Sequence, residues 1–251
     1  YGQGTRESNL RTNFDTGVTV EFWLKKEAFN NSLSEKEVVF DLWNSGSSGS
    51  AGYGRLTLSL TGAASGSPFI ITAQSGTVSA SVSNNSIGDS LTTGSLSAWH
   101  HYAFRFYNTG SSFIAKLYVD GNLNDTNTYT SNALGDITSG SMLATIGALV
   151  GPPSGSTAVR GDGKLSGSID DFRFWKASRN SEQISVNYFD NVGGGSNTDI
   201  SNTTLGVYYK FNEGITTDSA VDSMVLDYSG RISNGVWVGY GASSRSTGSA
   251  M

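Results

Sequence analysis

Residues 18–25 read VTVEFWLK, and two kinds of side chain alternate along this stretch. Apolar residues occupy every second position, namely Val18, Val20, Phe22 and Leu24. Successive side chains of a β-strand point to opposite faces of a sheet. The alternation therefore predicts a strand with one buried face. The other face would carry Thr19, Glu21, Trp23 and Lys25.

Short segments of the same kind follow along the chain. They read VVFDLWN (38–44), RLTLSL (55–60), PFIITA (68–73), TVSASVS (77–83), AWHHYAFRFY (98–107), FIAKLYVDG (113–121), MLATIGAL (142–149), SIDDFRFWK (168–176) and LGVYYKFN (205–212). Turns rich in Gly, Ser and Asn separate them, and Asp120-Gly121 is a hairpin-type turn signal. With only three Pro in the chain, the hydrogen-bond donors of the strands stay in place. We therefore predict an all-β fold, an antiparallel β-sandwich of the jelly-roll type.

One segment departs from this pattern and predicts a short helix near residues 181–188. Asn180 has the side chain of a helix N-cap, and Gln183 follows three residues later in a capping-box spacing. Ile184 and Tyr188 then lie one helical turn apart on one face.

Composition excludes several classes of function. The net charge is −5 and no cluster of Lys or Arg occurs, so we expect no nucleic-acid partner. No run of 18 apolar residues occurs, so we expect no membrane insertion. The chain has no Cys, and its two His residues are adjacent, which excludes disulfides, thiolate zinc sites and multi-His metal sites. The 12 Phe, 11 Tyr and 5 Trp are enough to build a sizeable core.

Four segments in order resemble the laminin-G-like, concanavalin A-like jelly-roll superfamily. VTVEFWLK (18–25) is similar to its opening core strand, and AWHHYAFRFY (98–107) to its W-H-x-V/A strand. KLYVDGNL (116–123) is similar to its L-Y-V-D-G hairpin. GKLSGSIDDFRFWKASRNSEQI (163–184) is similar to its I-D-D strand and the helix that follows. The resemblance covers about residues 18–190.

The resemblance suggests a domain division. Residues 1–190 form the laminin-G-like sandwich, and residues 191–204 form a polar linker. Residues 205–251 then either supply a closing strand to the same sandwich or begin a further module. The arrangement of VGGGSNTD before LGVYYKFNEG also resembles structural proteins of tailed-phage virions. That likeness implies a virion or extracellular location, with other virion proteins and further copies of the chain (a homo-oligomer) as partners.

Catalytic patterns are weak in this sequence. The β-glucanases of the superfamily use a pair of Glu residues on one strand, and no such run occurs here. Asp170 and Asp171 are neighbours on a predicted strand, so their side chains should point to opposite faces. No G-x-S-x-G elbow supports a Ser-His-Asp triad. We therefore expect a chain that is not an enzyme.

A calcium site is the cofactor hypothesis. Asp170 alternates in phase with Phe172 and Phe174, which predicts a carboxylate on the core face that needs a partner or a metal ion. Asp171, on the opposite face with Arg173, is expected to be an ordinary surface partner. The resemblance implies that the first Asp of I-D-D and the D-x-S-G turn hold Ca²⁺ together; the residues are Asp170, Asp227, Ser229 and Asn234. Alternatively, Asp170 accepts backbone N–H groups and Asp227 begins an Asx turn.

Two groups of residues could bind a glycan, because sugar rings stack on aromatic rings beside polar loops. The first consists of Trp43, Asn44 and Tyr53, and the second of Trp237 and Tyr240. The alternative is that these Trp residues only cover the edges of the sandwich. His100 is expected to face inward with Tyr102, and His101 to face outward.

Three functions follow from these observations. The first is a non-enzymatic virion surface protein with a lectin-like domain, which recognises a host glycan or decorates the particle. The second is a packing domain of a larger virion protein without any ligand. The third, a glycoside hydrolase, is disfavoured by the missing carboxylate pair.

Overall fold

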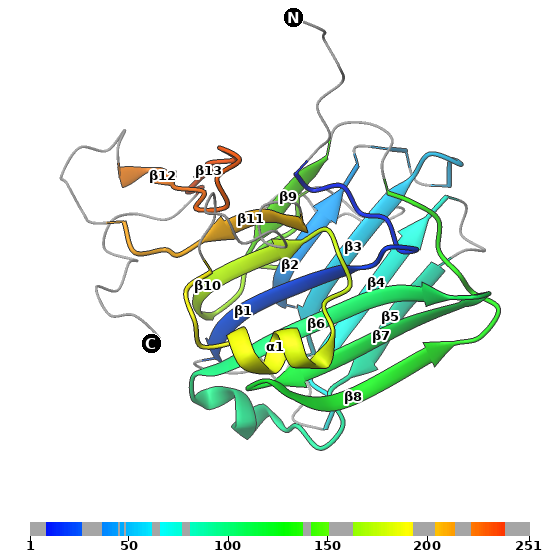
Figure 1. Ribbon diagram of the computed structural model, residues 1–251, viewed down its shortest axis with the longest axis horizontal. Coiled ribbons are helices and arrows are strands. Elements are labelled where there is room, and N and C mark those ends of the chain that lie inside the picture. Colours follow the sequence, from blue (N-terminus) through cyan, green and yellow to red (C-terminus); the bar gives the residue numbers. More distant parts are fainter. Residues whose placement is uncertain are drawn as a thin grey trace, which may run out of the picture.

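Two antiparallel β-sheets pack face to face and enclose one hydrophobic core (Figure 1). The computed structural model describes residues 9–26, 37–44, 46–47, 49–61, 66–76, 81–137, 142–150, 163–192, 204–213 and 222–238. In spatial order, the six-stranded sheet consists of β11 (Leu205–Tyr209), β10 (Gly167–Trp175), β1 (Val18–Lys26), β6 (His100–Thr109), β7 (Ser112–Val119) and β8 (Asn122–Tyr129). The five-stranded sheet consists of β5 (Ser81–Ile87), β4 (Phe69–Ser75), β3 (Gly54–Leu60), β2 (Glu37–Trp43) and β9 (Leu143–Ile146). The predicted antiparallel sandwich is confirmed.

The alternation in residues 18–25 builds the middle of the core as predicted. All four of its apolar side chains are fully buried between the sheets. Phe22 stacks on Phe104 of β6 and on Phe172 of β10, with ring centroids 5.9 Å and 6.5 Å apart. Phe40 of the opposite sheet lies 5.2 Å from Phe172. Aromatic contacts therefore join both sheets across the core.

Strand β8 differs from the sequence-based expectation, which placed no strand between residues 121 and 142. The hairpin turn itself is confirmed, because φ is 46° at Asp120 and 77° at Gly121. Residues 122–129 then pair with β7 along their whole length and form the edge of the sheet. Four of the eight side chains are exposed, and the other four are only partly buried. A strand at the edge of a sheet can pair without burying an apolar face. The sequence of β8 therefore shows no alternation of apolar residues.

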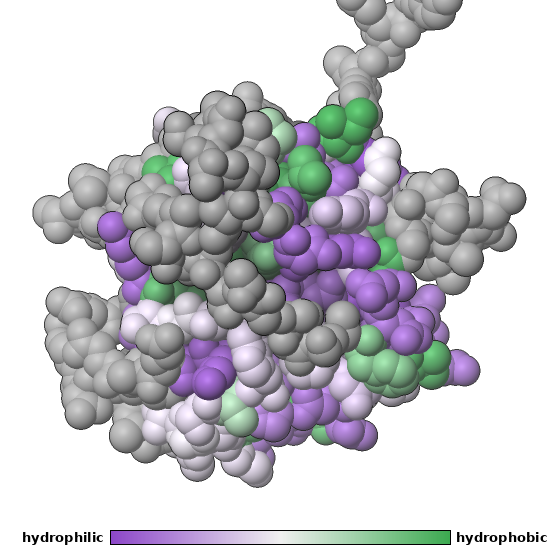
Figure 2. Space-filling view, turned by 90° about the vertical axis from the view of Figure 1, so that its left-hand side faces the viewer, coloured by the Kyte–Doolittle hydropathy of each residue, from purple (hydrophilic) through white to green (hydrophobic). Residues whose placement is uncertain are grey.

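The C-terminal part adds to the same sandwich. Strand β11 pairs antiparallel with β10, and Asp227 forms a single β-bridge with Tyr209 of β11. Beyond it, β12 (Met224–Val225) and β13 (Gly235–Val236) form a two-stranded ribbon. Most of the expected linker, residues 193–203, lies outside the described residues. Figure 2 shows the β10–β13 side of the molecule, where purple and pale residues cover most of the described surface and green ones form small, separate groups.

The short helix α1 (Ser181–Asn187) covers the outer face of the six-stranded sheet (Figure 1). Its predicted capping box is confirmed, because the Gln183 N–H donates to Asn180 Oδ1 over 2.8 Å and the Asn180 N–H donates to Gln183 Oε1 over 2.9 Å. Ile184 packs on Ala103 of β6 and Tyr118 of β7. A second, 3₁₀ helix spans Thr93–Ser97. Neither helix in the described part of the chain has the length and apolar character that crossing a membrane requires.

Candidate functional site

The outer face of the five-stranded sheet, the side that points away from the core, carries an ordered set of polar and aromatic residues. Trp43 of β2 lies opposite Arg55 of β3, Arg55 lies opposite Gln74 of β4, and Gln74 lies opposite Ser81 of β5. We call these four residues the outer row. Asp41, Thr57 and Thr72 form the next row along the same strands. Because side chains two positions apart share a face, both rows point away from the core.

Asp41 and Arg55 form a buried ion pair beneath this face. Arg55 Nε and Nη2 donate to the two Asp41 carboxylate oxygens over 3.0 Å and 2.6 Å. Thr57 Oγ1 and the Val150 backbone N–H donate to the same carboxylate over 2.6 Å and 2.8 Å. Burial opposes the charge of Arg55, but Asp41 outweighs it and raises the Arg55 pKa. Arg55 and Asp41 therefore compensate each other within one buried salt bridge.

Trp43 and Gln74 are the partly exposed members of the outer row next to this pair. The Trp43 indole Nε1 donates to the Gly46 carbonyl over 3.0 Å, which fixes the ring at the end of β2. The Gln74 Nε2 is enclosed and has no hydrogen-bond partner among the described residues. A buried donor without an acceptor costs about 1–3 kcal/mol.

The structure corrects two members of the first predicted glycan group. Asn44 is 1% exposed and organises the loop after β2: its Nδ2 donates to the Gly52 carbonyl over 2.7 Å, and its Oδ1 accepts from the Gly46 and Gly54 N–H groups. Tyr53 points to the same outer face as Arg55 but is only 6% exposed. Trp43 alone of this group presents a partly open ring. Asn44 was misjudged because the sequence does not show that its amide is fully used by its own loop.

The second predicted glycan group lies in the C-terminal segment. Trp237 packs on Phe211 with ring centroids 5.7 Å apart, and its backbone N–H donates to the Ser223 carbonyl over 2.8 Å. These contacts tie residue 237 to the β12–β13 ribbon. Tyr240 lies outside the described residues. The structure thus assigns Trp237 a packing contact, and the outer row contains neither residue.

The residues predicted to hold calcium form a closed turn instead of a ligand set. Asp227 Oδ1 accepts from the Tyr208 and Ser229 N–H groups over 3.0 Å and 2.9 Å. Its Oδ2 accepts from Ser229 Oγ and the Ser233 N–H over 2.9 Å and 2.8 Å. Asn234 Oδ1 accepts from the Asp227 N–H over 2.9 Å. These oxygens already have protein donors, which is the Asx-turn alternative, so the turn does not fit Ca²⁺.

Asp170 is also placed differently from the prediction. A β-bulge lies between Glu21 and Trp23 in the pairing of β1 with β10, and Asp171 in this region has φ 51°. The extra residue shifts the alternation, so that Asp170 pairs with Trp23 on the outer side while Phe172 still enters the core. Asp170 Oδ1 accepts from the Asp171 N–H over 2.9 Å. Among the residues that the structure describes, no group of three or more His, Asp or Glu side chains could hold a metal ion.

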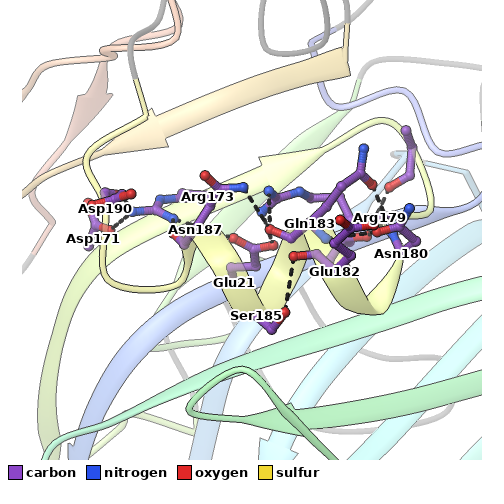
Figure 3. Close-up of polar contacts among 12 residues, drawn as sticks. Glu21, Asp171, Arg173, Arg179, Asn180, Glu182, Gln183, Ser185, Asn187 and Asp190 are labelled. Atoms are coloured by element: carbon purple, nitrogen blue, oxygen red, sulfur yellow. Dashed lines mark hydrogen bonds and ion pairs between the residues drawn. The ribbon is translucent and has the colours of Figure 1, made fainter.

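A second polar centre, which the sequence did not reveal, lies beneath α1 (Figure 3). We call Glu21, Asp171, Arg173 and Arg179 the sealed network. Arg179 Nη1 donates to Glu21 Oε1 over 2.6 Å, and Arg173 Nη1 lies 3.6 Å from Glu21 Oε2. Arg173 also pairs with Asp171 and donates to the backbone carbonyls of Asn187 and Asp190. Asp171 is 3% exposed, which corrects its expected role as a surface partner.

Electrostatics explain how the sealed network tolerates burial. Burial opposes ionisation of Glu21, but the charges of Arg179 and Arg173 outweigh it and hold the Glu21 pKa below its ordinary value. Burial raises the pKa of Asp171, and the charge of Arg173 opposes that rise. His101 lies beside them on the outward side of the sheet, as predicted, but is 0% exposed. Burial lowers the pKa of His101 to about 4, so its ring is neutral at neutral pH.

Two signals could have found these residues. RLTLSL (55–60) and FDLW (40–43) alternate, which puts Arg55 and Asp41 on the same outer face as Trp43. In the same way, Glu21 and Arg173 lie on the polar sides of their strands. What the sequence does not show is which polar face the helix covers.

The comparisons with known proteins concern the fold of the chain. Residues 3–185 match the family model described as the concanavalin A-like lectin/glucanases superfamily. A comparison with curated protein sequences finds no match.

Solved structures with the same fold include a Bacteroides ovatus protein provisionally assigned to carbohydrate binding. It is 18% identical with a TM-score of 0.53, and the match covers 90% of this chain and 52% of that one. This chain therefore spans about half of that relative. A heptameric pentraxin from Limulus polyphemus is 15% identical with a TM-score of 0.46, covering 73% of this chain and 77% of that one. Tailspike protein 2 of an Escherichia coli O157:H7 bacteriophage is 15% identical with a TM-score of 0.47, covering 80% of this chain and 24% of that one.

Proposed function

Because this chain belongs to the concanavalin A-like lectin/glucanase superfamily, we propose that it is a non-enzymatic carbohydrate-recognition module. One observation carries the proposal: a partly exposed Trp43, fixed at the end of β2, stands in one row with Gln74 and Ser81 on the outer face of a sheet. An aromatic ring beside amide and hydroxyl groups is what a sugar requires, because its ring stacks on the aromatic face and its hydroxyls exchange hydrogen bonds.

The state of the acidic residues supports a role without catalysis. A glycosidase needs two carboxyl groups on either side of the bond it cleaves. In the described part of this face, Asp41 accepts four hydrogen bonds from Arg55, Thr57 and Val150. Glu21 and Asp171 are engaged beneath α1. None of these carboxylates is free to donate a proton or attack a sugar.

The setting of this activity stays a prediction. We propose a virion surface or another extracellular location, with a cell-surface glycan, other virion proteins and further copies of this chain as partners. The resemblance of the C-terminal arrangement to phage structural proteins supports this setting.

A glycan array tests the function. The wild-type chain should bind at least one glycan class, and Trp43→Ala should weaken that binding about tenfold or more, which corresponds to about 1.4 kcal/mol. Trp237→Ala is the matched control, because it removes the same side chain from outside the outer row. Silence of the wild-type chain, shown by its unfolding transition to be folded, would instead favour a packing domain without ligand. Release of shorter sugars would show a hydrolase.

A further inference from the structure

The charges of the five-stranded sheet define the class of ligand that its outer face can accept. Its five strands contain only three charged residues, namely Glu37, Asp41 and Arg55. Glu37 pairs with Lys26 over 3.1 Å and accepts from the Ser166 N–H over 2.6 Å. Asp41 and Arg55 pair with each other. Every charge carried by these strands is therefore compensated within the protein.

On this basis, and resting on the proposed function, we infer that the ligand is an uncharged oligosaccharide, bound along the outer row across β2, β3, β4 and β5 without a bridging metal ion. An acidic sugar would require an exposed Arg or Lys, since a desolvated carboxylate or sulfate without a partner is costly. Arg55 is 4% exposed and makes two hydrogen bonds to Asp41, so it does not offer that contact.

The remaining groups of the face suit neutral hydroxyls. Strands β4 and β5 read FIITAQS and SVSNNSI, and their polar side chains are amides and hydroxyls. Gln74 is partly exposed on this face and carries an amide group. Thr72 Oγ1 accepts from the Asn84 N–H over 3.2 Å, which extends the polar surface toward β5.

The length of the outer row indicates more than one sugar unit. Trp43 and Ser81 are separated by three strand-to-strand steps, which at about 4.8 Å each span about 14 Å. This distance exceeds the width of a single sugar ring. A monosaccharide could reach Trp43 or Ser81 but not both.

The carboxylate oxygens of this face are not open to a bridging metal ion. Metal-mediated sugar binding needs carboxylate oxygens that are open to the ion. Among the described residues of the outer row and its neighbouring row, Asp41 is the only one with a carboxylate, and its two oxygens accept four hydrogen bonds from protein donors.

The test uses the full chain and two matched probe sets, neutral oligosaccharides of increasing length and oligosaccharides that contain uronic or sialic acid. Each is titrated at low and high salt, with calcium or with chelator. We expect neutral probes to bind more tightly as they lengthen, with little effect of salt or chelator. Trp43→Ala and Gln74→Ala should each weaken binding about tenfold. Thr128→Ala, on an exposed residue of β8 in the other sheet, is the control.

The possible results distinguish a failure of this inference from a failure of the proposed function. Preference for acidic probes, a large loss in high salt, or a loss with chelator would overturn the inference and leave carbohydrate recognition intact. Equal affinity for a monosaccharide and its longer forms would overturn the extended site. Absence of binding to both probe sets by the folded chain would overturn the proposed function itself.

Discussion

The outer faces of the two sheets both contain buried Arg–carboxylate pairs, but only one of them is closed by a helix. On the six-stranded sheet, α1 and the residues after it cover Glu21, Arg173 and Arg179, all 5% exposed or less. On the five-stranded sheet, Asp41 and Arg55 are equally buried, yet Trp43 and Gln74 beside them stay partly exposed. The difference shows that a buried ion pair alone does not identify a functional site.

The two outer faces differ in what their buried ion pairs bind. In the sealed network, the arginines bind the backbone carbonyls of Gln183, Asn187 and Asp190, so the charges fasten α1 and its C-terminal extension to the sheet. On the five-stranded sheet, the Asp41–Arg55 pair binds Thr57 and Val150. Trp43 and Gln74 of the outer row stay partly exposed beside it. We therefore interpret the first as a structural fastening and the second as the floor of a binding surface.

The largest effect should come from breaking the sealed network with Glu21→Gln. This change leaves Arg173 and Arg179 with one acid instead of two, and removal of one partner from a buried pair costs about 3–5 kcal/mol. We expect a loss at the upper end of this range in the free energy of unfolding, measured by urea denaturation. Glu182→Gln, on an exposed residue of α1, is the control and should change the free energy little. Equal effects of the two changes would contradict the fastening role.

Asp41→Asn tests the open face and should have the next largest effect. The change leaves Arg55 uncompensated, so we expect a loss of about 3 kcal/mol in the free energy of unfolding. It should also alter ligand choice, because the floor of the outer row then carries a positive charge. Titration of the variant with neutral and acidic oligosaccharides checks this. An unchanged preference would show that the floor charge does not select the ligand.

Low pH should reduce the free energy of unfolding, because His101 beside the sealed network becomes protonated. Its pKa is about 4 in the folded chain against an ordinary 6.5, so the folded state binds protons less well than the unfolded state. The stability it contributes is fully present above about pH 6.5 and is lost as the pH falls toward 4, by about 3 kcal/mol in all.

The groups that face His101 are Glu21, Arg173, Arg179 and Asp120, with the rings of Trp23 and Tyr188. Unfolding free energies measured from pH 7.5 to pH 4 for the wild type and for His101→Phe check the prediction. The variant should show a flatter profile in this window. A profile as steep as that of the wild type would assign the acid sensitivity to other groups.

The smallest effect should come from the N-cap of α1. Asn180→Ala removes the side-chain acceptor of the Gln183 N–H and should cost about 1 kcal/mol. Hydrogen exchange should become faster in residues 181–187 and stay unchanged in β3 and β4. Faster exchange on the five-stranded sheet would show that the two outer faces are coupled.

The sequence predicted the elements that local chemistry specifies. The alternation of residues 18–25, the Asp120-Gly121 turn and the capping box of α1 each depend on neighbours within a few positions. In the candidate site, the sequence predicted Trp43 as an exposed aromatic residue at the end of a strand. It did not predict that the Asn44 side chain binds its own loop.

The sequence did not predict features that depend on pairing between distant strands. One bulge beside Asp171 reverses the face of Asp170, and strand β8 exists because β7 offers it a partner. The outer row combines residues from four strands whose order becomes visible only once the sheet is assembled.

Strand β11 has a practical consequence for producing this protein. It contributes five residues from near the C-terminal end and is the outermost strand next to β10. A shortened chain that ends at residue 190 would leave the hydrogen-bonding groups of β10 unpaired, and exposed strand edges of this kind recruit other strands and aggregate. Recombinant versions intended for crystals, arrays or storage should therefore retain residues 204–209, even where the laminin-G-like similarity ends earlier.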